Sequence, residues 1–418
     1  MTNSSFAALG LAEPILRALA AENYTDPTPI QARAVPAILA GRDVLGIAQT
    51  GTGKTAAFAL PLLQRLAAEQ VQAGPHTVRA LILAPTRELA VQIHDSFRSY
   101  GRNLRLRHAV ILGGVNQSRQ VDALRRGVDV LVATPGRLLD LVKQRHVRLD
   151  AVTLFVIDEA DRMFDMGFIR DVRRITAELP KARQSMLFSA TMPGDVVHLV
   201  SEVLRDPVRI DISPKQITTE RVDQRVHYVA AQDKRALLLD LLQDEALSRV
   251  IVFTRTKHGA DKVAETLRRA GHRSDAIHGN KSQNARQRAL ETFRSGRTRI
   301  LVATDIAARG LDIDDVSHVV NFDIPHEAES YVHRIGRTAR AGNGGVAIAF
   351  CDSAERSQLR AIEKLTKQPL IVIGGGGDVR ASDCRPAPEN KENKQRPSNY
   401  GPRPRKRSRN RRPARKAA

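Results

Sequence analysis

The chain has 418 residues, 42% of them hydrophobic, which favours two folded domains and a further segment. Its formal net charge of +21 favours a polyanionic partner. Its two cysteines, Cys351 and Cys384, are too few for a disulfide framework and indicate a reducing, cytoplasmic location. We expect neither a signal peptide nor a membrane span, because no unbroken apolar run follows a basic leader or is long enough to cross a bilayer.

Short β-type runs alternate with helical patterns in two separate series. The first series has runs at residues 44–47, 80–83, 109–112, 130–132, 154–157 and 186–188. The second begins near Arg221 and has runs at residues 250–253, 300–302, 319–320 and 346–350. The runs lack strict polar–apolar alternation, as in parallel strands that are covered on both faces. The sequence therefore predicts an α/β fold with one parallel-sheet domain at residues 1–207 and another at residues 221–373.

A linker and a tail complete the predicted organisation. Residues 208–220 are polar, contain Pro214 and are predicted to join the two domains. Four glycines begin the segment 374–418, which is predicted to be a disordered basic tail, because residues 384–418 hold thirteen Lys/Arg against two Glu. Such a tail favours accessory binding to nucleic-acid phosphates. The alternatives are a solubilising tail and a membrane-surface segment, although no amphipathic helix or lipidation signal accompanies it.

A glycine-rich segment follows the first predicted strand and opens a helical pattern at residues 56–66. Its glycines allow backbone N–H groups to turn inward around phosphate oxygens. Lys54 is predicted to reach the β- and γ-phosphates, and the Thr55 hydroxyl to bind Mg²⁺. Ala48 stands where the general pattern has its first glycine. The predicted nucleotide-binding residues of this segment are Ala48, Gln49, Thr50, Gly51, Thr52, Gly53, Lys54 and Thr55.

The predicted strand at residues 154–157 ends in closely spaced acids. Taken alone, they read as an acidic turn, but the phosphate-binding segment upstream favours a catalytic role. Asp158 is predicted to hold Mg²⁺ through water, and Glu159 to position or deprotonate a water that attacks the γ-phosphoryl group. Asp161 is predicted to link this strand end to other motifs.

Residues 158–161 spell DEAD, and from about Phe6 to about Ala341 the chain resembles the DEAD-box RNA helicases of superfamily 2. The resemblance implies two tandem RecA-like domains, ATP and Mg²⁺ as cofactors, and RNA as the partner. Residues 4–32 resemble the Q motif of that family. There the resemblance implies that Gln31 hydrogen-bonds the adenine edge and that Tyr24 stacks on the base.

Other segments resemble the family's RNA-contacting and coupling motifs. Several follow predicted strands, where their Gly and Thr content suits helix N-termini that grip an RNA backbone, although each alone would read as a capped helix. The RNA contacts implied in this way are Thr86, Arg87, Gly113, Gly114, Thr134, Gly136, Arg137, Arg255, Gln283, Arg286, Thr304 and Arg309. The residues implied to couple ATP to RNA are Asp161, Ser189, Thr191 and His333.

Residues 333–340 resemble the family's arginine-rich motif VI. Arg337 and Arg340 lie three positions apart, so both can face the γ-phosphate from the second domain. An arginine supplied in this way accelerates phosphoryl transfer by about 10³–10⁵-fold and makes hydrolysis depend on domain closure. Ala339 replaces a glycine that many members carry, and the resemblance places Asp312 at the ATP ribose.

Residues 161–168, 253–260 and 278–283 resemble the bacterial RhlE-type subgroup most closely. The predicted function is an RNA-dependent ATPase that unwinds short duplexes with little sequence preference, in ribosome assembly or RNA turnover, with ribonucleoprotein or RNA-degradation partners. The alternatives are an ATP-gated RNA chaperone or clamp with little unwinding, and a DNA translocase of a neighbouring helicase family.

Overall fold

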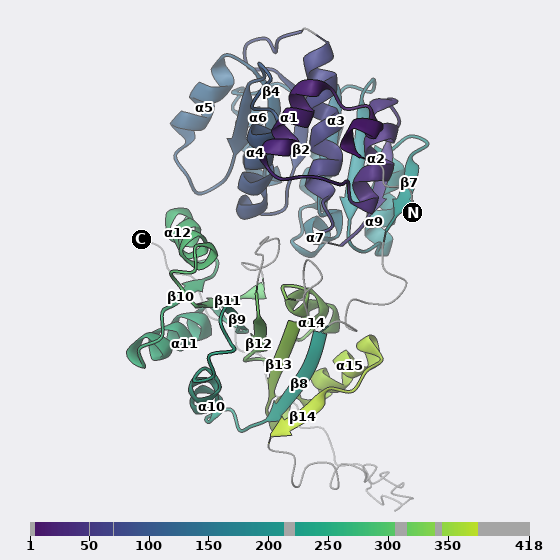
Figure 1. The fold of residues 1–418 in the computed structure, drawn as a ribbon. Helices are drawn as coiled ribbons and strands as arrows, with labels where there is room; N and C mark the ends of the chain where they lie inside the picture. The colour runs from purple at the N-terminus through teal and green to yellow at the C-terminus, as the bar shows by residue number, and fades with distance from the viewer. Residues whose placement is uncertain are drawn as a thin grey trace, which may run out of the picture. The chain divides into compact units, whose positions relative to one another are not determined.

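The computed structural model describes residues 5–49, 51–69, 71–212, 222–305, 316–338 and 345–374. Among these residues the chain forms two sheets of seven parallel strands, each with helices on its faces (Figure 1). This confirms the predicted α/β fold with two parallel sheets. No helix in the described ranges is both long and apolar enough to cross a bilayer.

The first sheet has the strand order β3-β4-β2-β5-β6-β1-β7. Its strands are β1 (Val44–Ile47), β2 (Val78–Leu83), β3 (His108–Ile111), β4 (Val128–Ala133), β5 (Leu154–Ile157), β6 (Gln184–Ser189) and β7 (Val208–Asp211). Its helices are η1 (Phe6–Leu9), α1 (Glu13–Ala21), α2 (Pro29–Leu39), α3 (Lys54–Ala68), α4 (Arg87–Tyr100), α5 (Gln117–Arg125), α6 (Pro135–Lys143), α7 (Ala160–Asp165), α8 (Ile169–Ala177) and α9 (Gly194–Val203).

Both faces of this sheet are buried, which explains why β5 is apolar at every position. In β5, Val156 packs into one core with α1 to α4, while Phe155 and Ile157 pack into a second core with α5 to α9. The strands are in parallel register, with Ile157 opposite both Leu83 and Leu187. The loops after β1, β2, β4, β5 and β6 therefore all leave the same edge of the sheet, where ligands bind in open α/β sheets.

The second sheet has the strand order β10-β11-β9-β12-β13-β8-β14. Its strands are β8 (Val222–Tyr228), β9 (Val250–Phe253), β10 (Ser274–Ile277), β11 (Ile300–Ala303), β12 (His318–Asn321), β13 (Gly345–Cys351) and β14 (Ile371–Gly374). Its helices are α10 (Lys234–Leu241), α11 (Lys257–Arg269), α12 (Gln283–Arg294), α14 (Ala328–Ile335), η3 (Ser353–Glu355) and α15 (Arg356–Thr366).

The first sheet extends into the segment that was predicted to be the linker. Residues Val208 to Asp211 form β7 and pair with Val44 to Ile47 of β1. β7 is a half-exposed edge strand, so its polar residues resemble those of a linker. Residues 213–221 lie outside the described part of the chain, as does the predicted tail beyond Gly374.

Candidate active site

The loop between β1 and α3 has the geometry of a phosphate cradle. Gly51 and Gly53 have φ angles of 83° and 89°, a backbone conformation that side chains disfavour. A Cβ atom on Gly53 would also lie only 2.4 Å from Nε2 of Gln31. Thr52 Oγ1 donates a hydrogen bond of 2.7 Å to the Gln49 carbonyl oxygen and tightens the turn. The loop then runs directly into the N-terminus of α3, which favours anions.

Lys54 is the first residue of α3 and its side chain is buried. Its Nζ atom donates a hydrogen bond of 2.9 Å to the carbonyl oxygen of Ala48, at the other end of the loop. The ammonium group thus lies inside the cradle, where it was predicted to meet the phosphates, and is held by the loop itself. A phosphate oxygen would take the place of this carbonyl as its acceptor.

Gln31 contacts the same loop from α2 and is only 1% exposed. Its Oε1 atom accepts a hydrogen bond of 2.9 Å from the Thr28 backbone N–H, and its Nε2 atom donates one of 3.1 Å to the Gly53 carbonyl oxygen. The structure therefore brings the Q motif and the phosphate loop together, although Gln31 was singled out for adenine alone.

Tyr24, the predicted adenine-stacking residue, is 39% exposed. Its ring packs edge-on against Tyr100 and tilted against Phe6, with centroid separations of 5.9 Å and 6.3 Å. The two tyrosine hydroxyl oxygens are 3.1 Å apart and share a hydrogen bond. The ring is thus oriented by the C-terminal end of α4, a neighbour that sequence reasoning missed.

Asp158 and Glu159 follow β5 and are both buried. Burial raises the pKa of Asp158 to about 7, although the Lys54 ammonium favours its charged form. Burial also disfavours the charged form of Glu159, but the Arg162 guanidinium and Lys54 outweigh it and lower the pKa of Glu159. Two adjacent carboxyl groups with opposite pKa displacements are typical of a catalytic site.

Arg162 positions Glu159 and was not predicted. Its Nη1 atom lies 2.7 Å from Glu159 Oε2, and both side chains are less than 10% exposed. Glu159 itself has a φ angle of 52°, which turns the chain from β5 into α7. The sequence did contain an indication of this ion pair, because a glutamate and an arginine three residues apart at a helix start lie on the same face of the helix.

Asp161 connects the end of β5 to the end of β6. Its Oδ2 atom accepts hydrogen bonds from the Ala190 and Thr191 backbone N–H groups, at 3.1 Å and 2.8 Å, and from the Thr191 hydroxyl at 3.0 Å. Ser189 Oγ accepts a hydrogen bond from the Asp161 backbone N–H at 3.1 Å. Asp161, Ser189 and Thr191 thus form one contiguous network, as a role in coupling requires.

Three predicted RNA contacts of the first domain also converge. A Cβ atom on Gly114 would come within 2.3 Å of Nη1 of Arg87, so the guanidinium lies directly against the glycine backbone. Burial, with a contribution from the positive charge of Arg137, lowers the pKa of Arg87. Thr86 caps α4, since its hydroxyl oxygen accepts a hydrogen bond from the Leu89 backbone N–H, and Thr134 occupies the N-cap position of α6. Gly136 faces open space. Clustered arginines at helix starts form a site that suits phosphate.

In the second domain, Arg255 follows β9 and Thr304 follows β11. The two strands are paired with Phe253 opposite Ala303, so these predicted RNA contacts lie at adjacent strand ends. Gln283 begins α12 and Arg286 lies one turn later. The predictions for Thr50, Arg309, Asp312 and Arg340 fall on residues outside the described ranges.

Motif VI spans the end of α14. His333 lies within this helix, and its carbonyl oxygen accepts a hydrogen bond of 3.3 Å from Arg337 Nε. Arg334 is 2% exposed and does not face solvent. Its guanidinium binds both carboxylate oxygens of Asp305, at 2.6 Å and 2.8 Å, and Asn321 Oδ1 at 3.1 Å. Arg334 therefore braces the segment after β11, a role that the sequence did not indicate.

Comparisons with known proteins agree with this geometry. A family profile described as DEAD/DEAH box helicase matches residues 28–200, and one described as Helicase conserved C-terminal domain matches residues 233–342.

The chain is 45% identical over 376 residues to RNA helicase CrhR of Synechocystis sp., covering 89% of this chain and 75% of CrhR. It is 42% identical over 369 residues to DEAD-box ATP-dependent RNA helicase CshA of Bacillus cereus, covering 88% and 69%. It is 45% identical over 377 residues to ATP-dependent RNA helicase RhlB of Xanthomonas axonopodis pv. citri, covering 89% and 66%.

A solved structure extends the similarity to the whole fold. The structure of S. cerevisiae Dbp5 bound to RNA and ADP BeF3 matches with a TM-score of 0.80 and 33% identity, covering 89% of this chain and 96% of that chain. The predicted tandem RecA-like fold is thereby confirmed.

Proposed function

Because this chain belongs to the family of DEAD-box ATP-dependent RNA helicases, we propose that it is an RNA-dependent ATPase that binds RNA with both domains and locally unwinds short duplexes when ATP drives closure. One observation carries the proposal: the phosphate cradle and the acids after β5 share one sheet edge, where the Lys54 charge acts on the buried Asp158. A phosphate loop and a buried carboxylate so arranged are the parts that nucleoside triphosphate hydrolysis requires.

ATP binding involves the loop and the Q motif. The N–H groups around Gly51 and Gly53 and the Lys54 ammonium hold the phosphates. Tyr24 stacks on the adenine, and Gln31 reads its edge while it contacts Gly53. The contact between Gln31 and the loop supports this, because one side chain then senses both the base and the phosphates.

The donor set around Asp158 fits a magnesium ion. The carboxylate is buried, and its raised pKa reports that Lys54 alone does not supply enough positive charge to offset burial. Thr55 and Asp158 would hold the ion, with water as its other ligands, since Mg²⁺ keeps several waters in such sites. When bound, Mg²⁺ neutralises charge on the phosphate oxygens.

Glu159 positions and deprotonates the attacking water, and its lowered pKa keeps it in the ionised form that accepts a proton. Arg337 and Arg340 stabilise the charge on the transferred phosphoryl group from the second domain. Hydrolysis then depends on closure of the two domains, which RNA favours. The bound state of the Dbp5 structure, with RNA and ADP BeF3, supports this dependence by analogy.

RNA is held by its backbone in this proposal. The helix N-termini at Thr86 and Thr134 and the arginines near them provide donors for phosphate oxygens, which carry no sequence information. The segment 384–418, with thirteen Lys/Arg, acts as an accessory RNA-binding element that raises the local RNA concentration. We infer a cytoplasmic enzyme with a role in ribosome assembly or RNA turnover.

The RhlE-type assignment rests on residues 161–168, 253–260 and 278–283 alone. CrhR, RhlB and CshA match at 42–45% identity, and these near-equal values support the family without singling out the RhlE type. We therefore propose the general activity of the family and attach no subgroup-specific partner to it.

The test compares ATP hydrolysis without nucleic acid, with a single-stranded RNA and with a DNA of the same sequence. We expect stimulation by RNA and little by DNA, and ATP-dependent separation of a short RNA duplex. Equal stimulation by DNA would favour a DNA translocase. RNA-stimulated ATP hydrolysis without strand separation would favour an ATP-gated clamp, and no stimulation would contradict the proposal.

A further inference from the structure

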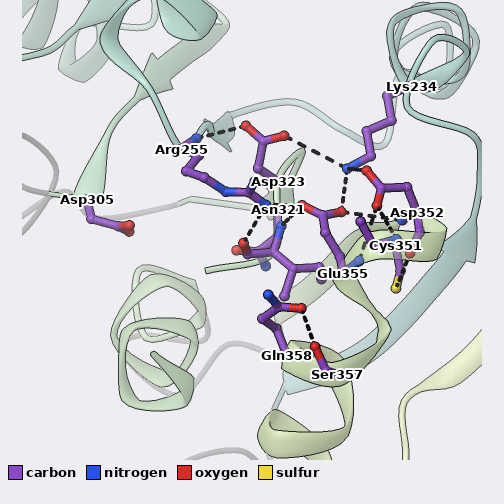
Figure 2. A network of polar contacts seen from close by, with 12 residues as sticks. Lys234, Arg255, Asp305, Asn321, Asp323, Cys351, Asp352, Glu355, Ser357 and Gln358 are labelled. Carbon is purple, nitrogen blue, oxygen red and sulfur yellow. Dashed lines mark hydrogen bonds and ion pairs between the residues drawn. The ribbon is translucent and has the colours of Figure 1, made fainter. Parts of the chain in front are cut away.

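A buried cluster of charged residues lies beside Arg255 in the second domain (Figure 2). Its centre is Glu355, at the end of η3, whose side chain is 4% exposed. Beside it lies Lys234, the first residue of α10, which is 2% exposed. Their charged atoms, Lys234 Nζ and Glu355 Oε2, are 2.5 Å apart. The two residues are 121 positions apart and belong to none of the motifs described above.

Each oxygen of the Glu355 carboxylate has two donors. Oε2 accepts from Lys234 Nζ and, at 3.3 Å, from the Asp352 backbone N–H. Oε1 accepts from the Ile324 backbone N–H at 3.1 Å and from Nη2 of Arg255. A carboxylate has about four hydrogen-bond acceptor sites, so the acceptor sites of Glu355 are all occupied.

The same cluster holds the Arg255 backbone N–H against the segment after β12. Asp323 Oδ2 accepts a hydrogen bond of 2.8 Å from the Arg255 backbone N–H, and Asp323 Oδ1 lies 3.8 Å from Lys234 Nζ. The Asp323 carbonyl oxygen accepts one of 2.6 Å from Arg334. The segment after β12 is therefore held between Arg255 and Arg334, and Glu355 and Lys234 provide its buried anchor.

Arg255 is only partly enclosed by this anchor. Its side chain is 38% exposed, and the contacts of its guanidinium are made by Nη2, to Glu355 and at 3.4 Å to the Ile324 carbonyl oxygen. Within the described part of the chain, no acceptor binds its Nε or Nη1. A planar guanidinium that is fixed at one nitrogen offers the others at a defined angle, as bidentate binding of a phosphate requires.

We propose that Glu355 and Lys234 are positioning residues for RNA binding: the buried carboxylate, neutralised by the lysine, holds Arg255 so that its exposed nitrogens meet an RNA phosphate. This rests on the proposed RNA-dependent ATPase activity and adds two residues to it. Neither Glu355 nor Lys234 touches RNA or ATP, and each acts through Arg255.

The test uses the full chain and compares Glu355→Gln, Arg255→Ala and the double variant. The readouts are the Kd for a fluorescent single-stranded RNA in the presence of a non-hydrolysable ATP analogue, and KM for RNA and kcat in ATP hydrolysis. Glu245→Gln is the matched control, because Glu245 is an exposed acid in the loop before β9. We expect Arg255→Ala to weaken RNA binding about tenfold, the effect of one charge-assisted contact.

Glu355→Gln should raise Kd and KM for RNA by roughly three- to tenfold and leave kcat at saturating RNA within about twofold, because its effect is on binding alone. The double variant should bind RNA no more weakly than Arg255→Ala, since both changes remove the same contact. Multiplied effects in the double variant, or an unchanged Kd for Glu355→Gln, would overturn the proposal.

A second variant keeps the proposal testable if Glu355→Gln unfolds, because that change removes the charge of the carboxylate nearest to the buried Lys234. Arg255→Lys retains a cation for Glu355 but loses the planar fork. We expect it to keep the thermal midpoint and still weaken RNA binding, and normal binding would overturn the proposal. If Arg255→Ala and Glu355→Gln both lower RNA affinity, without multiplied effects in the double variant, while the unmodified chain shows no RNA-stimulated hydrolysis, the proposed function fails and the positioning role stands.

Discussion

The Nζ atom of Lys54 donates a hydrogen bond of 2.9 Å to the carbonyl oxygen of Ala48, so a backbone carbonyl of the phosphate loop already contacts the lysine ammonium group. ATP must therefore compete with a backbone carbonyl for this ammonium group. A γ-phosphate is the better acceptor because it is charged.

We expect Lys54→Ala to lower ATP hydrolysis by about 10²-fold or more, since the lysine stabilises charge that develops on the phosphates. RNA-stimulated phosphate release measures the loss. The thermal midpoint should fall somewhat, because the Ala48 carbonyl oxygen loses its donor and the buried Asp158 loses the Lys54 charge, so hydrolysis is compared well below the midpoint of both chains. Near-normal turnover would remove Lys54 from the site.

Glu159 provides a second prediction, because Arg162 holds its carboxylate at 2.7 Å. Glu159→Gln keeps a hydrogen-bond acceptor for Arg162 but loses the base. Hydrolysis should fall by about 10²-fold or more, while ATP and RNA binding stay close to normal. Single-turnover hydrolysis and equilibrium RNA binding separate the two effects. Asp171→Asn, in the first turn of α8, is a control with the same charge change. Equal losses of binding and hydrolysis would show that Glu159 is structural.

The structure explains which parts of the fold the sequence predicted. Central strands such as β5 are covered on both faces and appear as unbroken apolar runs. The strands β7, β10 and β14 were missing from the predicted runs, and all three lie at sheet edges. Strand β8 was missing as well, because it alternates buried and half-buried positions. Polar residues on the open side of such strands break the apolar pattern.

The residues of the site also fall into those that the sequence predicted and those that it did not. Lys54 and Asp158 were found because each follows a strand within a short, recognisable pattern. Glu355 and Lys234 were not found, because they lie 121 positions apart and their partnership exists only after the sheet has formed. Tyr100 was missed for the same reason, since it reaches Tyr24 from a different helix.

Tyr100 provides a third prediction, because its hydroxyl group holds the ring of Tyr24. We expect Tyr100→Phe to raise KM for ATP about threefold, the effect of one neutral hydrogen bond, with kcat unchanged. Tyr24→Phe should give a similar rise and the double variant no more. A fall in kcat, or no change in KM, would show that this hydrogen bond does not orient the ring for adenine.

His108 provides a prediction about acid stability. Burial lowers the pKa of this β3 side chain to about 4, with a smaller contribution from the positive charge of His94. The folded state thus resists a proton that the unfolded state accepts near pH 6.5, so stability is lost as pH falls from about 6.5 to about 4. His108→Phe removes this loss and places another ring beside Phe97, whose centroid is 6.3 Å from that of His108.

Urea unfolding at pH 7 and pH 5 measures the effect. The parent chain should lose about 2 kcal/mol more between these pH values than His108→Phe does, as the pKa difference requires. His326→Gln changes an exposed histidine and should behave like the parent. The same loss in His108→Phe as in the parent would show that other groups cause the acid sensitivity.

The last prediction concerns residues 384–418, which hold thirteen Lys/Arg and two Glu. Each phosphate that a cation neutralises releases condensed counterions, so the slope of log K against log salt measures the number of contacts, at about −0.7 per contact for a single strand. Deleting this segment should make the slope shallower and weaken RNA binding most at low salt. ATP hydrolysis at saturating RNA should remain, because the phosphate cradle and the acids after β5 are intact.

A chain of full length in which the thirteen Lys/Arg are changed to Gln separates charge from length. It should behave like the deletion, since the effect is electrostatic and does not depend on sequence. If instead it retains the parent's slope and affinity, the segment does not contact RNA through its charges. The positive charge of the two folded domains would then account for all of the salt dependence.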